Sequence, residues 1–312
     1  MLLRGCYLFV KRLPGFNALR YEVLVVDSTT SDRSRTIVGN SCCLENLEMS
    51  PNEISQRLEF ALEVSREAAK LILRYYLSVD LIVDQKRDRT PVTAADRGAE
   101  ELIRGRIARR FPDDGVFGEE FGETKGRNGV RWVLDPVDGT KAFIHGVPLF
   151  GTLIGLEADG QLLAGVCRLP ALNEVVYGAT GLGAWWQIGD AAPRRAKVSS
   201  VERLDEAMVC TTSLNNWREA GKFETFERIN SLARETRGWS DCYGHALVCT
   251  GRADVMLDPL LNPWDAAALV PILKEAGGQF FDWTGVETIH GGNGISTNGR
   301  LKRALLQELS AG

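Results

Sequence analysis

The chain has 312 residues, of which 44% are hydrophobic and 25% charged, a composition that excludes disorder throughout and suits one compact unit in two lobes. The formal net charge of −4, from 37 basic and 41 acidic residues, offers no broad positive surface for nucleic acid or an anionic membrane, and a small polar substrate fits better. Seven cysteines without C-x-x-C spacing exclude a disulfide framework and indicate reduced thiols in a cytoplasmic protein.

The first 48 residues differ from the rest of the chain. Arg4, Lys11 and Arg12 interrupt the apolar opening, so it lacks the run that a signal peptide or membrane span needs, and we predict neither export nor a membrane anchor. No sustained periodicity follows. We predict a non-core, poorly ordered N-terminal extension over 1–48, which a start codon chosen too far upstream also explains, and a folded domain over 49–312. A functional arm is the alternative for the extension.

Two amphipathic helices are predicted at the start of this domain. A capping box at Ser50 and Glu53 begins the first, and apolar residues recur on one face to about Tyr76. Thr93 caps the second helix, and Pro112 ends it. We expect the two helices to pack together.

From residue 130 the pattern changes to short apolar runs separated by turns. The predicted strands are 132–134, 149–156, 162–166 and 174–177. Asp159-Gly160 indicates a hairpin, and Pro271 should kink the helix that contains it. Later helices are predicted near 217–233, 240–250, 264–276 and 299–309, with strands near 255 and 279–282. This alternation predicts a layered α/β fold with mixed sheets.

The apolar strand over 132–134 leads directly into a turn that contains two acids. Asp135 and Asp138 should both emerge at the end of the strand, while Pro136 fixes the chain and Gly139 allows a close backbone approach. A cation or a phosphate could be met there by carboxylates, carbonyls and amides together. A plain turn rich in turn-forming residues also explains the segment.

Other acids occur at positions where each has an ordinary explanation. Glu119 and Glu120 follow a break in the chain and could form a solvated face. Asp265 lies at N3 of a helix capped by Asn262, and Asp96 lies at N3 of the second helix. Favourable interaction with the helix dipole would by itself explain both acids. Taken together, however, such acids would supply the oxygen ligands of a hard cation.

Crowded carboxylates repel one another unless they are protonated or neutralised by a metal. Mg²⁺ is the expected ion, because it prefers oxygen ligands and the sequence lacks the His and Cys clusters typical of zinc. The three histidines are too scattered for a zinc centre and are predicted to have core or surface roles: His145, His245 and His290.

Three linked motifs give this pattern a specific resemblance. In order along the chain, they are Gly118-Glu119-Glu120, Asp135-Pro136-Val137-Asp138-Gly139-Thr140, and Trp264-Asp265-Ala266-Ala267 followed by Glu275-Ala276-Gly277-Gly278. They resemble the signatures of inositol monophosphatase-like phosphatases from about residue 50 to the end. The resemblance implies an α-β-α-β-α sandwich of the sugar-phosphatase type, and hydrolysis of phosphomonoesters by a metal-activated water without a covalent intermediate.

The same resemblance implies two or three Mg²⁺ ions per active site. Glu119, Asp135 and the Val137 carbonyl would bind one ion. Asp135, Asp138 and Asp265 would bind another, and Asp265 would also contact the substrate. Two metals about 4 Å apart can lower the pKa of a water and neutralise phosphate oxygens, so the chemistry agrees with these roles.

The remaining implied roles concern the water and the phosphate. Glu120 would help to hold a third metal or its water, and Asp96 with Thr140 would orient the attacking water. The amides of Gly139 and Thr140 would receive the phosphate. We expect a metal-binding lobe over about 49–195 and a substrate-specificity lobe over about 196–312 in the phosphatase domain.

Substrate choice is expected to depend on the later segment. Ser240 and Asp241 precede a helix, and Asp258 ends a strand. The carboxylate at Asp241, with Lys141, Phe143 and the run 148–152, resembles the histidinol-phosphate phosphatases within the family. L-Histidinol phosphate carries an ammonium group that Asp241 and Asp258 could pair with, whereas an inositol ring is neutral. The expected reaction is its hydrolysis to L-histidinol plus phosphate, a step of histidine biosynthesis. A helix cap for Asp241 and a turn role for Asp258 are the alternatives.

Other functions remain open at this point. An inositol monophosphatase or a 3′(2′),5′-bisphosphate nucleotidase would use the same metal motifs, and a nucleotidase would need a purine platform such as Trp185, Trp186 or Trp239. A catalytically silent metal-binding protein is a different class that keeps the fold. The resemblance also implies a possible homodimer.

Overall fold

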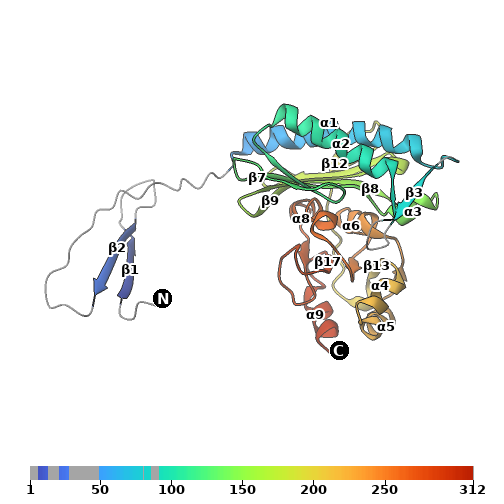
Figure 1. Ribbon diagram of the computed structural model, residues 1–312. Helices are drawn as coiled ribbons and strands as arrows, with labels where there is room; N and C mark the ends of the chain where they lie inside the picture. Colours follow the sequence, from blue (N-terminus) through green and yellow to red (C-terminus); the bar gives the residue numbers. More distant parts are fainter. Residues whose placement is uncertain (1–5, 13–20, 28–48, 80, 86–90, 312) are drawn as a thin grey trace. The chain divides into compact units, whose positions relative to one another are not determined.

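The computed structural model describes residues 6–12, 21–27, 49–79, 81–85 and 91–311, the first two ranges as backbone only. The chain divides into two compact units, Met1–Leu47 and Glu48–Gly312. In the first unit, β1 (Cys6–Arg12) pairs antiparallel with β2 (Tyr21–Asp27) (Figure 1). The prediction of a poorly ordered extension over 1–48 falls mostly outside the described residues and stays a prediction.

Two long helices cover one face of the larger sheet of the second unit (Figure 1). α1 (Pro51–Tyr75) begins in the predicted capping box, in which the Ser50 side chain and the Glu53 side chain each accept the other residue's backbone amide. α2 (Ala94–Arg110) begins at Thr93 with the same arrangement and ends at the predicted stop. Both helix predictions are confirmed.

The larger sheet has the strand order β12-β11-β10-β9-β8-β7-β5-β6. Its strands are β5 (Gly115–Gly118), β6 (Gly122–Thr124), β7 (Val130–Asp138), β8 (Gly151–Ala158), β9 (Gln161–Leu169), β10 (Glu174–Ala179), β11 (Gly183–Ile188) and β12 (Arg194–Arg195). Neighbouring strands are antiparallel except β5 and β7, which are parallel. Asp159-Gly160 forms the predicted hairpin turn, and both residues have positive φ. A separate pair, β3 (Val83–Gln85) and β4 (Pro91–Thr93), precedes α2.

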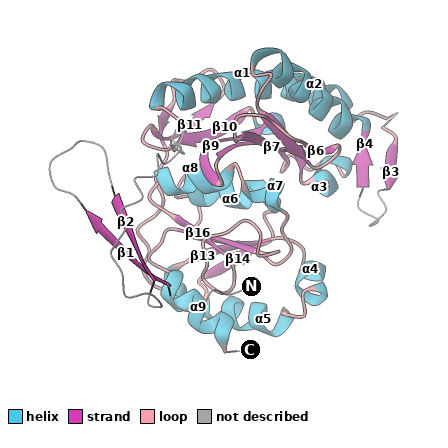
Figure 2. Ribbon diagram, turned by 60° about the vertical axis from the view of Figure 1, so that its left-hand side comes forward, coloured by secondary structure: helices cyan, strands magenta, loops and turns pink. Residues whose placement is uncertain are grey.

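A middle layer of helices separates the larger sheet from a second sheet (Figure 2). This layer consists of α6 (Asp241–Cys249), α7 (Pro263–Ala266) and α8 (Leu269–Glu275). The second sheet has the order β14-β13-β15-β17-β16, with strands β13 (Met208–Thr211), β14 (Glu235–Arg237), β15 (Val255–Asp258), β16 (Gln279–Phe281) and β17 (Gly294–Thr297). Its other face is covered by α4 (Leu214–Glu219), α5 (Phe223–Leu232) and α9 (Lys302–Ser310). Buried apolar clusters fill the spaces between layers, and the predicted α-β-α-β-α architecture is confirmed.

Two of the predicted helices are each divided, so those predictions are wrong as single elements. Over 217–233, Gly221 has a φ of 66° and separates α4 from α5. Over 264–276, the break lies at Ala267–Ala268, because Pro271 lacks the amide that would bond the carbonyl four residues earlier. The proline therefore stands in the first turn of α8, where no amide is needed.

Glycines in β8 and β9 let the middle layer approach the larger sheet closely. A Cβ added at Gly165 would lie 1.8 Å from the Ala268 carbonyl oxygen, and one at Gly155 would lie 2.9 Å from the Ala267 carbonyl carbon. Both contacts are at the chain segment just after α7, the helix that carries Asp265. The sheet and this acid are therefore held at a fixed separation.

We expect Gly165→Ala to lower the free energy of unfolding by about 3 kcal/mol, since the backbone of the middle layer must move. Gly105→Ala is the matched control: its added Cβ meets nothing within 4 Å in α2 and should stabilise the protein by about 0.5–1 kcal/mol. Urea unfolding of both variants checks this. Equal stability of Gly165→Ala and the wild type would contradict the close approach.

Candidate active site

The turn that ends β7 places two acids on one side of the sheet. Pairing with β8 changes register between Asp135 and Asp138, a local irregularity at the end of the strand. Asp135 Oδ1 accepts the Val137 amide at 3.0 Å, and Thr152 Oγ1 donates to the Pro136 carbonyl at 2.8 Å. The first bond stabilises the turn internally, and the second connects it to β8.

The next residues turn the chain into a short helix. Gly139 has a φ of 81°, which favours glycine, and it begins α3 (Thr140–Ile144). The Thr140 hydroxyl lies 3.3 Å from Asp96 Oδ1 and 3.1 Å from the Val137 carbonyl. Since Asp96 belongs to α2, this hydroxyl joins the turn to the first layer of helices.

Three acids from two distant segments meet at this turn. Asp135, Asp138 and Asp265 each present a carboxylate oxygen within 4.8 Å of the others. Asp135 is 2% exposed and Asp138 is 8% exposed. Asp265 in α7 is held by the Asn262 amide, which donates to its Oδ2 at 2.7 Å. The sequence placed these groups 130 residues apart, and the fold brings them together.

Glu119 joins the group from the other side. It follows β5, and its amide donates to the Leu134 carbonyl at 3.1 Å, which anchors it beside β7. The Glu119 charge adds to the effect of burial in raising the pKa of Asp135. Burial raises the pKa of Asp96 and of Asp265, and the Glu119 charge adds to both rises. Glu119 therefore lies within electrostatic reach of acids from three other segments.

The acids raise one another's pKa values. Burial is the largest cause: it holds the pKa of Asp135 and Asp138 well above the usual range and brings that of Asp265 to about 7, and the neighbouring acids add to each rise. A cation between the carboxylates would remove this repulsion. The donors are oxygens alone, which fits a hard divalent cation such as Mg²⁺ rather than zinc.

Two further acids adjoin this group at the edge of the second sheet. β14, β13 and β15 are parallel, so their carboxyl ends lie at one edge, where ligands commonly bind. Asp258 ends β15, and Asp241 is the first residue of α6, after β14. Burial raises the pKa of both, and the Asp241 charge raises that of Asp258 and Asp138 further. The Lys141 charge opposes the rise at Asp241.

The chain is strained where Asp241 enters α6. Ser240 has a φ of 30° and Asp241 a φ of 38°, values that cost non-glycine residues roughly 1–3 kcal/mol each. The Ser240 hydroxyl donates to Asp241 Oδ2. A Cβ added at Gly139 would lie 3.1 Å from that same oxygen, so the Asp241 carboxylate lies close to the turn after β7.

The structure thus joins most of the acids singled out from the sequence. The joined acids are Asp96, Glu119, Asp135, Asp138, Asp241, Asp258 and Asp265. The amide of Glu120 donates to Glu100 Oε2 at 2.8 Å, and the predicted role of Glu120 with a third metal stays a prediction.

Sequence reasoning missed Glu100. It is fully buried, it accepts Arg104 Nε at 2.7 Å, and a Cβ on Gly118 would lie 2.1 Å from it. This carboxylate therefore fixes the segment that carries Glu119 and Glu120. The sequence feature that could have indicated its burial is its position at the edge of the apolar face of α2.

The three histidines have the core and surface positions that the sequence predicted. His245 is buried, its Nδ1 lies 2.7 Å from Ser296 Oγ, and burial lowers its pKa to about 3. His145 and His290 are exposed. The guanidinium groups of Arg194 and Arg252 lie 3.7 and 4.2 Å from the Trp186 ring centre, so protein cations already cover this one of the three tryptophans weighed as a purine platform.

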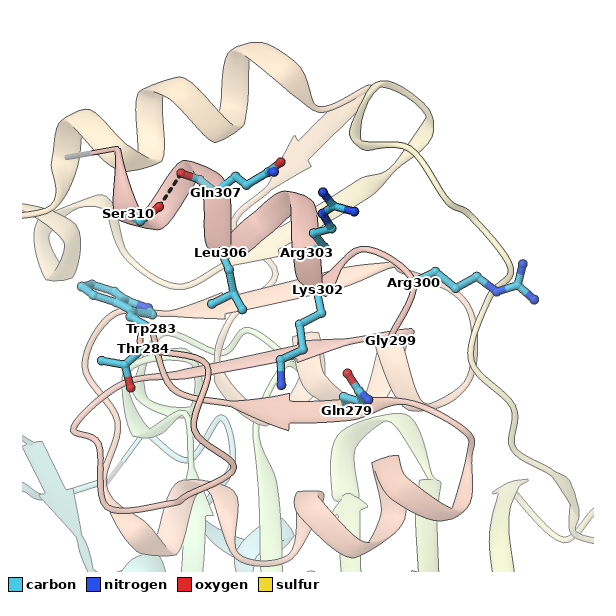
Figure 3. A pocket seen from close by; sticks show the side chains of 10 residues that line it. All are labelled: Gln279, Trp283, Thr284, Gly299, Arg300, Lys302, Arg303, Leu306, Gln307 and Ser310. Atoms are coloured by element: carbon cyan, nitrogen blue, oxygen red, sulfur yellow. Dashed lines mark hydrogen bonds between the residues drawn. The ribbon is translucent and has the colours of Figure 1, made fainter.

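A hollow of about 860 Å³ lies elsewhere, between α9 and the second sheet (Figure 3). It is lined by Gln279, Trp283, Thr284, Gly299, Arg300, Lys302, Arg303, Leu306, Gln307 and Ser310. None of the joined acids lines it. The hollow is therefore separate from the candidate active site at the acids.

Comparisons with known proteins agree with the motifs. The model of the Inositol monophosphatase family matches residues 53–311. A histidinol-phosphatase of Chlorobaculum parvum is 44% identical over 256 residues, which are 82% of this chain and 97% of that protein. A histidinol-phosphatase of Mycobacterium tuberculosis is 39% identical over 255 residues, 82% and 98% of the two chains. The chain belongs to the inositol monophosphatase family.

Solved structures show the same architecture. The extragenic suppressor protein suhB of Bartonella henselae has a TM-score of 0.76 and 29% identity, covering 82% of this chain and 99% of that one. A Thermotoga maritima IMPase has a TM-score of 0.73 and 32% identity, covering 82% and 97%. Among the residues that the structure describes, no helix is both long enough and apolar enough to cross a membrane.

Proposed function

We propose that the chain is a Mg²⁺-dependent phosphoric monoester hydrolase that converts L-histidinol phosphate to L-histidinol plus phosphate in histidine biosynthesis. The observation that supports it best is the meeting of Asp135, Asp138 and Asp265 beside Asp241 and Asp258. The first three suit a divalent cation, and the last two suit a cationic leaving group. The relatives named histidinol-phosphatase support the same substrate.

The metal-binding roles are proposed for residues that the fold joins. Glu119, Asp135 and the Val137 carbonyl would hold one ion, and Asp135 would share the second with Asp138 and Asp265. Glu120 would serve a third. When bound, Mg²⁺ supplies charge that neutralises phosphate oxygens and lowers the pKa of a coordinated water.

The neighbouring groups would orient the water and the phosphate. Thr140 Oγ1 lies within hydrogen-bonding distance of Asp96, so this pair can accept a proton from the attacking water and direct its lone pair to phosphorus. The amides of Gly139 and Thr140 open a helical turn, where backbone N–H groups are free to bind phosphate oxygens.

Selection of the leaving group is assigned to Ser240, Asp241 and Asp258. The two carboxyls have pKa values raised by burial, and a substrate ammonium beside them would favour their ionised forms. Removing two carboxylates from water costs free energy, and a cationic ligand bound between them offsets this cost. An inositol ring, with hydroxyls alone, would leave both charges uncompensated.

Phosphate release from L-histidinol phosphate and from inositol monophosphate, each with Mg²⁺, tests the proposal. We expect wild type to prefer the former, and Asp241→Asn to lower kcat/KM for it by about 10- to 100-fold, the cost of a hydrogen bond to a charged group. Asp190→Asn, the same change at an exposed acid, should have no effect. A preference for inositol monophosphate would reject the histidinol assignment and leave the metal chemistry intact.

Two expectations about organisation accompany this proposal. We propose that 49–195 acts as the metal-binding lobe and 196–312 as the substrate-specificity lobe. The larger sheet ends with β12 at Arg195 and the second sheet starts with β13 at Met208, which supports a division between them. A homodimer and a cytoplasmic location stay predictions.

A further inference from the structure

The short turn between β5 and β6 is held by elements outside its own hairpin. The amide of Glu119 donates to the Leu134 carbonyl of β7 at 3.1 Å. The next two amides, of Glu120 and Phe121, donate to the two carboxylate oxygens of Glu100 at 2.8 and 3.3 Å. Three consecutive amides of the turn are therefore bound to β7 and to α2.

Glu100 reaches this turn as one half of a buried ion pair. It is fully buried, and Arg104, one helical turn further along α2, donates from Nε to Glu100 Oε1 at 2.7 Å. The other guanidinium nitrogens of Arg104 donate to the Gly122 carbonyl and to the Thr124 hydroxyl, so the pair also binds β6. A buried ion pair commonly stabilises a fold no more than apolar side chains of the same volume would. Stability alone therefore does not explain a carboxylate at this position.

The same face of α2 carries an acid of the candidate active site. Asp96, Glu100 and Arg104 follow one another at intervals of four residues, so they share a face and each lies about 6 Å further along the helix axis. The Asp96 carboxylate contacts the Thr140 hydroxyl. One rigid helix therefore holds the acid that would orient the water and the residue that binds the turn of Glu119.

The Glu100 carboxylate has no space in which to shift. A Cβ added at Gly118 would lie 2.1 Å from Glu100 Oε1 and 2.9 Å from Oε2. The carboxylate is thus confined by the chain on one side and by its hydrogen-bond donors on the others. Groups that fix a metal ligand in this way commonly contribute 10- to 100-fold to metal affinity.

We propose that Glu100 is a positioning residue that holds the turn carrying Glu119 and Glu120 in place for metal binding. The inference rests on the proposed function, because it takes Glu119 as a metal ligand. It adds that the metal affinity depends on a buried carboxylate of α2, which none of the three motifs includes.

Titration calorimetry of the metal-free full chain with Mg²⁺ tests the proposal without relying on turnover. Glu100→Gln should bind Mg²⁺ about tenfold more weakly than the wild type. The new amide nitrogen is a donor and would face a backbone N–H or the Arg104 guanidinium, so at least one bond to the turn or to Arg104 is lost. Glu101→Gln is the matched control, since it makes the same change at an exposed neighbour in the same helix. Glu101→Gln should retain the wild-type affinity.

A double-mutant cycle with Glu119→Gln distinguishes positioning from a purely structural role. If Glu100 acts through the Glu119 carboxylate, the tenfold effect of Glu100→Gln should shrink to less than about threefold when Glu119 is already glutamine. A purely structural role would lower the melting temperature and leave the Mg²⁺ affinity of the folded protein unchanged. An equal effect of Glu100→Gln in both backgrounds would overturn the proposal.

Gly118→Ala displaces the same carboxylate without altering its charge. Its methyl group occupies the position of the Glu100 oxygens, so it should weaken Mg²⁺ binding about as much as Glu100→Gln does. Gly105→Ala, in open space on α2, should bind Mg²⁺ like the wild type. This pair keeps the proposal testable if Glu100→Gln fails to fold, and equal affinities in the two alanine variants would count against it.

The outcomes separate this inference from the proposed function. Equal Mg²⁺ affinity in Glu100→Gln and Glu101→Gln, with an active wild type, would overturn the positioning role alone. Weaker binding in Glu100→Gln that depends on Glu119, together with a wild type that releases phosphate from neither ester, would reject the proposed function and support the positioning role. A wild type that binds no Mg²⁺ would overturn both.

Discussion

Asp138→Asn is expected to lower kcat/KM by roughly 10³-fold, or about 4 kcal/mol of transition-state stabilisation, while the protein remains folded. Asp138 is one of three carboxylates that meet within 4.8 Å, and an amide cannot neutralise a divalent cation. Phosphate release under saturating Mg²⁺ measures the loss.

The same change should stabilise the metal-free protein at pH 8. Burial, with Asp241 and Asp265 nearby, holds the Asp138 pKa well above its usual range, so the ionised acid destabilises the fold and asparagine removes that cost. Asp190→Asn controls for the loss of one negative charge, because Asp190 is exposed. Turnover within tenfold of the wild type, or a lower melting temperature in Asp138→Asn, would contradict the role given to Asp138.

Removal of Mg²⁺ should destabilise the protein more at pH 8 than at pH 6. Asp265 has a folded pKa of about 7 against an ordinary value of 3.8. Its contribution to stability is therefore complete below about pH 3.8 and is lost as the pH rises through 7. Asp135, Asp138 and Asp258 have pKa values raised in the same direction. The metal-free melting temperature should fall across this range.

Mg²⁺ at about 100 times its Kd should restore about 2.7 kcal/mol, which is roughly 5–10 °C in melting temperature for a domain of this size. Thermal melts with EDTA or with Mg²⁺ at pH 6, 7 and 8 measure both effects. In Asp138→Asn the pH dependence without metal should be smaller. A metal-free protein that gains stability from pH 6 to 8 would show that these acids are not crowded.

Local patterns in the sequence were enough for the first two helices and for one hairpin turn. The bonds of a capping box join residues three positions apart, so Ser50 and Thr93 determine where α1 and α2 begin whatever lies around them. The same holds for the hairpin at Asp159-Gly160, because a positive φ is a property of the turn itself.

The position at which a helix is interrupted depends on packing against distant segments as well as on local sequence. The sequence predicted one helix over 264–276 with a kink at Pro271. The structure interrupts the helix at Ala267 and Ala268, which keep helical backbone angles and pack closely on Gly155 and Gly165. That packing joins residues about a hundred positions apart. Such packing between distant residues cannot be predicted from a local sequence pattern.

The sequence by itself determined which acids are available and, through the motifs, the family to which they belong. Only the tertiary structure decided that Asp265 meets Asp135 and Asp138, that Glu100 anchors the Glu119 segment, and that the Cys242 amide donates to Asp138. The physical reason is that burial and charge repulsion act through space. The raised pKa values, and with them the affinity for a cation, arise only when segments distant in the chain exclude water together.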